Sequence, residues 1–274
     1  MDSQEIRDAV EAAGAGWNLT DYGGSDAFRS MVGLSLGSET ARLLEPASRA
    51  AHEFKAPHLP DRFDWRHHQG GDWTGPVRAQ GSCMSCMSFA VTAAMEAAIR
   101  IRSGRSDTEL RLSEADLFFG AMGRCDVACV EPPAILNRAR DHGVCLSSDF
   151  PYEPRQLPHR QVPPKYKLAF WQALRSRPQR RAAIAEDGPI VACMQIFEDF
   201  LVYGGGVYRH VAGNELGLHA VCLVGYDDVD KYWIAKNSWS ERHGEGGYFR
   251  IAYGECGIDD ALSSYAITLG DELS

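Results

Sequence analysis

The sequence lacks any apolar run long enough to cross a membrane. No stretch approaches the roughly 18 apolar residues that a spanning helix needs. The first ten residues, MDSQEIRDAV, also lack the basic start and apolar centre of a secretory signal. We therefore expect a cytoplasmic protein if the chain is complete, and a secreted or lysosome-like protein if a signal has been removed.

Positive charge is scarce. The chain has 28 lysines and arginines against 37 aspartates and glutamates, a formal net charge of -9. Phosphate backbones and anionic membranes repel such a chain, so neither nucleic acid nor a membrane is expected as a partner. With 274 residues, 45% of them hydrophobic, the chain can bury one large core or two smaller ones. A peptide, a protein or a small molecule is the expected substrate.

Cysteine is too sparse for a small disulfide-rich scaffold, yet more frequent than a fold of this size requires. If one cysteine is a catalytic thiol, an odd number remains, and at least one more lies outside any disulfide. The eight cysteines are Cys83, Cys86, Cys125, Cys129, Cys145, Cys193, Cys222 and Cys256.

Helical patterns come first along the chain, and strand patterns come second. The segment after Cys86 has apolar residues at four-residue steps and no proline or glycine before Gly104. This predicts a buried helix of about 17 residues beginning at or beside Cys86. Ser113 is placed to cap a second helix, and Gly143 to end a third. Short β-branched and aromatic segments follow at residues 188–196, 217–228, 231–239 and 246–254. The order indicates an α+β protein with two lobes.

Cys86 has the setting of a nucleophilic thiol. A helix N-terminus stabilises a thiolate through its unpaired N–H groups and the positive end of its dipole. Gly81 and Ser82 permit a tight turn before the helix. The side-chain amide of Gln80 is placed to join the N–H of Cys86 in holding an oxyanion. One loop would then supply both the attacking thiolate and the N–H groups that stabilise the oxyanion.

The segment VRAQGSCMSCMSFA around Cys86 resembles the active-site segment of the papain and cathepsin family. In that family a histidine and an asparagine follow the catalytic cysteine by roughly 130 to 150 residues. Here His219 follows Cys86 by 133 residues and Asn237 follows it by 151. The resemblance implies that Cys86 is the nucleophile, that His219 is its proton partner and that Asn237 orients the histidine. It also implies that Trp239 shields the bond between histidine and asparagine from water.

Other matching segments run in the family's order from residue 59 to residue 265. They imply a papain-like α+β fold of two lobes. The helical lobe is expected mainly over residues 75–155, and an antiparallel β-barrel-like lobe mainly over residues 160–255. The active-site cleft is expected between the two lobes.

Residues 6–36 resemble the short propeptide of the cathepsin B branch. The resemblance implies that residues 1–58 are a propeptide-like segment, which acts as the protein's own inhibitor until it is cut between residues 53 and 59. Residues 59–274 would then be the peptidase domain. The long insertion that gives cathepsin B its exopeptidase action is missing, so endopeptidase action is expected.

The chain departs from the family pattern beside Cys86. The family usually has glycine and an aromatic residue near this cysteine, whereas this chain has Met84 and Met87. Glu131 and Pro132 stand where the family has two glycines whose backbone pairs with substrate, and proline has no N–H to donate. These changes favour a dedicated processing peptidase, such as one that trims the leader of a peptide natural product.

The resemblance also places the substrate-binding residues. The pocket positions are apolar, so we expect a hydrophobic side chain of the substrate there. The predicted substrate-binding residues are Pro133, Ala134, Cys193, Ala220, Ala261 and Trp239.

The resemblance implies a disulfide between Cys83 and Cys129, and we also consider a bridge between Cys125 and Cys145. Cys193, Cys222 and Cys256 are interpreted as small buried hydrophobic residues. Without the resemblance, the pairs at 83 and 86 and at 125 and 129 would also suit a redox pair or a zinc site. No metal or cofactor is expected, because the family context already uses each position.

The leading hypothesis is a cysteine peptidase that hydrolyses peptide bonds through an acyl-enzyme on Cys86. An amide ligase would use the same thiol but pass the acyl group to an amine. A non-catalytic binding protein would keep only the fold. The other eight histidines, among them His243, have no catalytic context and are interpreted as surface or turn residues.

Overall fold

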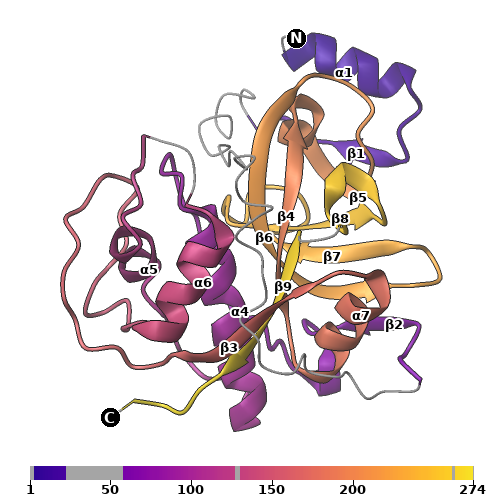
Figure 1. Ribbon diagram of the computed structural model, residues 1–274. Helices are drawn as coiled ribbons and strands as arrows, with labels where there is room; N and C mark the ends of the chain where they lie inside the picture. The colour runs from indigo at the N-terminus through magenta and orange to yellow at the C-terminus, as the bar shows by residue number, and fades with distance from the viewer. Residues whose placement is uncertain (1–2, 23–57, 127–129, 261–262, 274) are drawn as a thin grey trace.

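The computed structural model describes residues 3–22, 58–126, 130–260 and 263–273 (Figure 1). The α-helices are α1 (Ser3–Ala12), α4 (Cys86–Ser103), α5 (Glu114–Gly120), α6 (Pro132–Asp141) and α7 (Arg177–Glu186). The 3₁₀ turns are η1 (His68–Gly70), η2 (Glu198–Val202) and η3 (Glu255–Gly257). The strands are β1 (Trp17–Leu19), β2 (Arg62–Asp64), β3 (Leu168–Leu174), β4 (Ile190–Phe197), β5 (Tyr203–Tyr208), β6 (Glu215–Asp227), β7 (Tyr232–Lys236), β8 (Tyr248–Ala252) and β9 (Ser264–Leu269).

One sheet contains all the strands in the described residues. Its order is β1-β5-β8-β7-β6-β4-β9-β3, and β2 pairs with β6 outside this path. The pairings are antiparallel except for β5 with β8, which is parallel. Helix α4 packs against β6, and Figure 1 shows α4, α5 and α6 gathered on one side of the strands. The α+β prediction is confirmed.

The predicted helix at Cys86 forms because its sequence suits burial and ends at a glycine. Helix α4 is buried along most of its length. It stops at Gly104, whose left-handed backbone (φ 65°) any other residue would adopt only with strain. Ser113 caps α5 as expected, since its hydroxyl accepts a hydrogen bond from the N–H of Asp116 at 2.9 Å. No helix within the described ranges is long and apolar enough to span a membrane.

The described part of the N-terminal segment is anchored in the core of the sheet. Ile6, Val10 and Trp17 are buried in one hydrophobic cluster with side chains of the strands. Strand β1 adds to the edge strand β5, and Trp17 stands opposite Gly206. A Cβ at Gly206 would lie 2.8 Å from the Cα of Trp17, so this close pairing requires glycine. The indole N–H of Trp17 also donates to the backbone oxygen of Arg209 at 2.9 Å.

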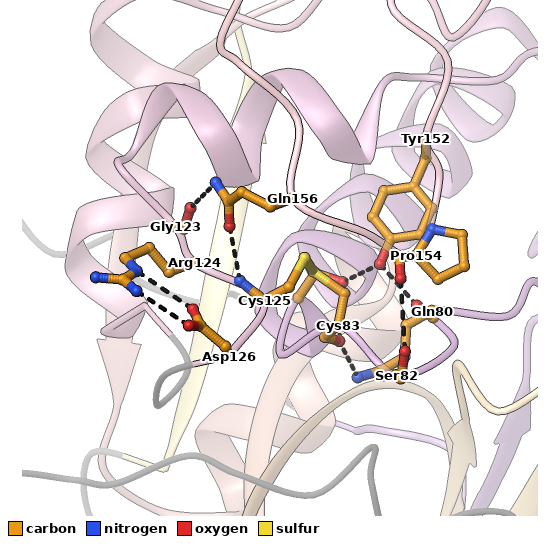
Figure 2. The surroundings of a disulfide bond; sticks show 11 residues. Gln80, Ser82, Cys83, Gly123, Arg124, Cys125, Asp126, Tyr152, Pro154 and Gln156 are labelled. Atoms are coloured by element: carbon orange, nitrogen blue, oxygen red, sulfur yellow. Dashed lines mark hydrogen bonds and ion pairs between the residues drawn. A yellow bond between two sulfur atoms is a disulfide. The ribbon is translucent and has the colours of Figure 1, made fainter.

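The disulfide predicted between Cys83 and Cys129 is wrong. Cys83 is bonded to Cys125 (Figure 2), and their Cα atoms lie 4.1 Å apart. The side chain of Gln156 fixes the turn before this bridge, because it accepts from the N–H of Cys125 at 3.1 Å and donates to Gly123 O at 3.4 Å. Cys129 lies outside the described residues.

The new pairing overturns two further ideas. A bridge between Cys125 and Cys145 is wrong, because Cys145 carries a buried thiol that is not in a disulfide. Burial raises the pKa of this thiol to about 12, so it is protonated at neutral pH. The zinc site also loses two of its four thiolates to the disulfide. Across the described ranges, no group of three or more His, Cys, Asp or Glu side chains is arranged to hold a metal ion.

Candidate active site

Cys86 is the first residue of α4 and is fully buried. The helix begins there because the backbone oxygen of Ser85 accepts from the N–H of Ser88 at 2.9 Å and of Phe89 at 3.2 Å. The thiol of Cys86 is not in a disulfide. At the first turn of an 18-residue helix, the helix dipole favours the thiolate over the thiol.

His219 and Asn237 are brought together by the pairing of β6 with β7. Cys222 stands opposite Lys236 in this register, so Asn237 follows directly on the strand that runs beside His219. The Nε2–H of His219 donates to Oδ1 of Asn237 at 2.8 Å. The other ring nitrogen, Nδ1, is buried and has no hydrogen-bond partner in the described part of the chain. An Nδ1 that is not engaged is available to exchange a proton with a thiol.

Cys86 lies in the same apolar cluster as the residues next to His219. The cluster includes Ala220 on β6 and Cys193 on β4, which stand opposite one another in the sheet. Burial raises the pKa of Cys193, and the charge of a Cys86 thiolate raises it further. The side chains of Cys86 and Cys193 are 0% and 4% exposed within this cluster.

Trp239 packs against His219. Its ring centroid lies 4.8 Å from that of His219, and its side chain is fully buried. A bridge between Trp239 and Ala79, just before the loop that carries Cys86, fixes the tryptophan backbone. His219 and Asn237 are 0% and 4% exposed, and a buried hydrogen bond is stronger than an exposed one.

Asn237 has a second histidine on its other side, which the sequence interpretation missed. Its Nδ2 donates to Nδ1 of His243 at 3.2 Å, and the Nε2–H of His243 donates to the backbone oxygen of Phe200 at 3.1 Å. His243 is fully buried, so its assignment to the surface or a turn is wrong. Burial lowers its pKa to about 3.

Gln80 is held rigidly beside the loop that carries Cys86. Its Oε1 accepts from the hydroxyl of Ser238 at 2.6 Å, and its backbone N–H donates to Ser238 O at 2.9 Å. The Nε2 group, which points the other way, donates to Cys83 O at 3.1 Å. The amide of Gln80 therefore turns its N–H face toward the turn that precedes Cys86.

The model of the papain family cysteine protease matches residues 59–266 of this chain. The chain belongs to the papain family. It is 33% identical to pro-cathepsin H of Mus musculus in an alignment of 224 residues that covers 76% of this chain and 65% of that protein. It is 30% identical to cysteine proteinase 1 of Zea mays in an alignment of 265 residues that covers 84% of this chain and 68% of that one.

Solved structures show the same fold. Procathepsin B S9 of Trypanosoma congolense aligns with a TM-score of 0.82 and 21% identity over 99% of both chains. A recombinant stem bromelain precursor aligns with a TM-score of 0.77 and 23% identity over 98% of this chain and 89% of that chain. The chain therefore has the predicted papain-like fold of two lobes.

The residues predicted to line the papain-type pocket differ in burial. Cys193 and Ala220 are buried side by side, and the partly buried Met84 packs against the same cluster. On α6, Pro133 is half-buried and Ala134 is exposed. Ala261 lies outside the described residues.

Proposed function

We propose that this papain-family chain hydrolyses peptide bonds through a thioester acyl-enzyme on Cys86. The observation that carries the proposal is the 2.8 Å bond from His219 to Asn237, which turns the second ring nitrogen away from the asparagine. Cys86 at the start of α4 shares an apolar cluster with the neighbour of His219. These features support a row of sulfur, imidazole and carboxamide.

The reaction follows from these groups. The proton of the Cys86 thiol passes to Nδ1 of His219, and the thiolate attacks the carbonyl carbon of the peptide bond. The N–H groups of Gln80 and Cys86 stabilise the negative oxygen of the tetrahedral intermediate. His219 then protonates the leaving amine. Water, deprotonated by His219, attacks the thioester and releases the acid with the thiol restored.

The pocket residues favour an apolar substrate side chain. Cys193, Ala220 and Met84 offer no charged group to a ligand. Met84, Glu131 and Pro132 support a dedicated processing peptidase over a broad protease, and the short spacing of Cys125 and Cys129, with no room for the long insertion, supports endopeptidase action. Profiling with a library of peptides tests this proposal, and a preference for charged side chains near the cleaved bond would contradict it.

We further propose that residues 1–58 inhibit the domain formed by residues 59–274. Helix α1 and strand β1 are anchored on the sheet. Cys86 and His219 have no exposed surface, so a substrate reaches them only after a movement. The proposed cut, between residues 53 and 59, falls mostly outside the described ranges.

Mass spectrometry of the purified chain over time tests both proposals. Wild type should digest an unfolded protein and lose its first segment by a cut between residues 53 and 59. Cys86→Ala should do neither. Cys145→Ala is the matched control, because it also removes a buried thiol outside any disulfide, and it should cleave as wild type does. Cleavage that persists in Cys86→Ala would refute the role of this thiol.

The amide ligase uses the same first step, so product analysis separates it from the peptidase. In the presence of an added amine, a ligase yields mainly the amide, whereas a peptidase yields mainly the acid. A non-catalytic binding protein would show no preferential labelling of Cys86 by iodoacetamide.

A further inference from the structure

Four groups form a continuous buried row behind the proposed nucleophile. His219 donates to Asn237 Oδ1 at 2.8 Å, Asn237 Nδ2 donates to His243 Nδ1 at 3.2 Å, and His243 donates to Phe200 O at 3.1 Å. All three side chains are buried. His243 lies 24 residues beyond His219 and six beyond Asn237, on the turn that follows β7.

The protonation of His243 follows from its partners. A backbone oxygen can only accept, so the Nε2 that faces Phe200 must carry a proton. Burial keeps the ring neutral, with a pKa lowered to about 3. Its Nδ1 therefore presents a lone pair, and the group of Asn237 that faces it must be the donor, Nδ2.

This requirement fixes the amide of Asn237. If the amide were reversed, Oδ1 would face the lone pair of His243, and Nδ2 would face the Nε2–H of His219. Both contacts would be repulsive. The backbone N–H of Ser238 adds to the preference, because it donates to the same Oδ1 at 2.8 Å.

We propose that His243 is a positioning residue for acyl transfer. By accepting from Asn237 Nδ2, it keeps Oδ1 directed at His219, and so keeps Nδ1 of His219 directed at Cys86. The inference rests on the proposed peptidase function, since it assigns the residue that orients the third member of the row. His243 does not contact the substrate in this role.

Two substitutions separate the two hydrogen bonds of His243. In His243→Asn, the side-chain oxygen lies near the place of Nδ1 and can still accept from Asn237. In His243→Gln, the side-chain amide reaches the place of Nε2 and keeps the bond to Phe200 O, but the acceptor for Asn237 is lost. The rate of alkylation of Cys86 by iodoacetamide from pH 5 to 9, in the full chain, is the readout, with the labelled residue identified by mass spectrometry.

We expect His243→Gln to lower the rate at pH 6 about tenfold, the effect of one lost hydrogen bond, and to shift the acid limb to higher pH. His243→Asn should stay within about twofold of wild type, as such an acceptor-preserving change predicts. On an Asn237→Ala background, His243→Gln should have no further effect. Equal profiles for wild type and a folded His243→Gln would overturn the inference, as would a full effect on the Asn237→Ala background.

Spectroscopy of the wild-type chain tests the row without any variant. In a protein labelled with ¹⁵N-histidine, the ring of His243 should stay neutral, with its proton on Nε2, from pH 5 to 8. A proton on Nδ1, or a charged ring, would overturn the inference even if the variants fail to fold. A wild-type Cys86 that reacts no faster than an ordinary thiol would instead count against the proposed function, and the two failures are therefore distinguishable.

Discussion

Two buried clusters lie on either side of Asn237, and different forces hold them together. The ionic cluster consists of Arg78, Glu96, Arg100, Glu114 and Lys236. In it, Arg78 donates to Glu96 at 2.7 Å and to Glu114 at 3.1 Å. Four of its members, all except Arg100, line a cavity of about 20 Å³ that Asn237 also borders, room for about one water molecule.

The aromatic cluster consists of Tyr22, Phe200, Tyr203, Trp239 and His243. The ring of His243 lies 4.8 Å from that of Trp239, 5.0 Å from that of Phe200 and 5.5 Å from that of Tyr22. All five side chains of this cluster are uncharged at neutral pH, because burial lowers the pKa of His243 to about 3.

The difference between the clusters follows from one short stretch of chain. Side chains alternate in direction along β7 and just beyond it. Lys236 therefore enters the ionic cluster, where it donates to Thr74 O at 2.8 Å and Gly75 O at 2.9 Å. Asn237 and Trp239 face the aromatic cluster. The ion pair between Arg78 and Glu96 ties α4, the helix that begins at Cys86, to the loop before it. The aromatic rings surround His243 with uncharged side chains on the other side of Asn237.

The largest effect is expected in the ionic cluster. Arg78→Met leaves Glu96 and Glu114, whose side chains are 1% and 0% exposed, without their main cation. Removing one partner of a buried ion pair costs about 3 to 5 kcal/mol. We expect the free energy of unfolding in urea to fall by about that amount.

An exposed ion pair provides the control. Arg124 and Asp126 pair at 3.0 Å with side chains that are 64% and 70% exposed. Arg124→Met should change the free energy of unfolding by less than about 1 kcal/mol. Equal losses of unfolding free energy in the two variants would show that burial does not determine how much the ion pairs of Arg78 contribute to stability.

Lys236 makes the ionic cluster sensitive to alkaline pH. Burial lowers its pKa to about 8, below the value of about 10.4 in the unfolded chain. Between these two values the unfolded state holds a proton that the folded state has released, so stability rises with pH across this window. Below pH 8 Lys236 is protonated in both the folded and the unfolded state, and the full cost of burying its charge lowers the stability of the folded protein.

The comparison of wild type with Lys236→Met isolates this contribution. The difference in free energy of unfolding, wild type minus variant, should rise by about 3 kcal/mol between pH 8 and pH 10.4. The charge of Lys236 also acts on its neighbour Cys222, but burial raises the pKa of that thiol to about 12, above this range. A difference that stays flat over this range would contradict the lowered pKa.

Short sequence patterns predicted the parts of the site that depend on local structure. The start of α4 at Cys86 follows from an apolar helix pattern, and β6 and β7 fall in two of the predicted strand segments. The resemblance to the papain family then pointed to His219 and Asn237, and the structure brings these two together. Their catalytic roles remain proposals.

The features that sequence reasoning missed depend on distant contacts. Cys83 is bonded to Cys125, and the backbone N–H of Cys125 donates to the side chain of Gln156, which lies 31 residues away in the sequence. His243 has a polar neighbourhood in the sequence, and its burial comes from Phe200 and from the N-terminal segment. The sequence offered one indication of a role for His243, its position six residues after Asn237. Sequence distance alone does not show which way a side chain points.

The aromatic cluster should respond less than the ionic cluster to a single change. Phe200→Leu keeps the backbone oxygen that accepts from His243 and removes the ring that meets Trp239, with centroids 5.5 Å apart. We expect the free energy of unfolding to fall by about 1 to 2 kcal/mol. Val229→Ala is the control, because this side chain is 57% exposed, and it should stay within about 0.5 kcal/mol of wild type. A loss above that of Arg78→Met would reverse the order of the two clusters.

The smallest effect is expected where the N-terminal segment joins the aromatic cluster. The hydroxyl of Tyr22 donates to Tyr203 O at 2.5 Å and accepts from the N–H of Gly244 at 2.7 Å. Tyr22→Phe keeps the ring over His243 and removes both hydrogen bonds, which should cost about 1 kcal/mol of local stability. Hydrogen exchange at the Thr20 amide, which donates to Val202 O at 2.8 Å, should become about fivefold faster.

A tyrosine of the helical side serves as the comparison for this change. Tyr166 pairs with Val144, far along the chain from β5, and Tyr166→Phe should leave the exchange of Thr20 unchanged. If Tyr22→Phe also leaves it unchanged, the Tyr22 hydroxyl does not hold the segment, which is then held by the burial of Ile6, Val10 and Trp17 and by the pairing of β1 with β5. Tyr22 would then add nothing to the stability of the aromatic cluster, whose last contributing member would be His243. A cut in the chain after Tyr22 would therefore not weaken the cluster.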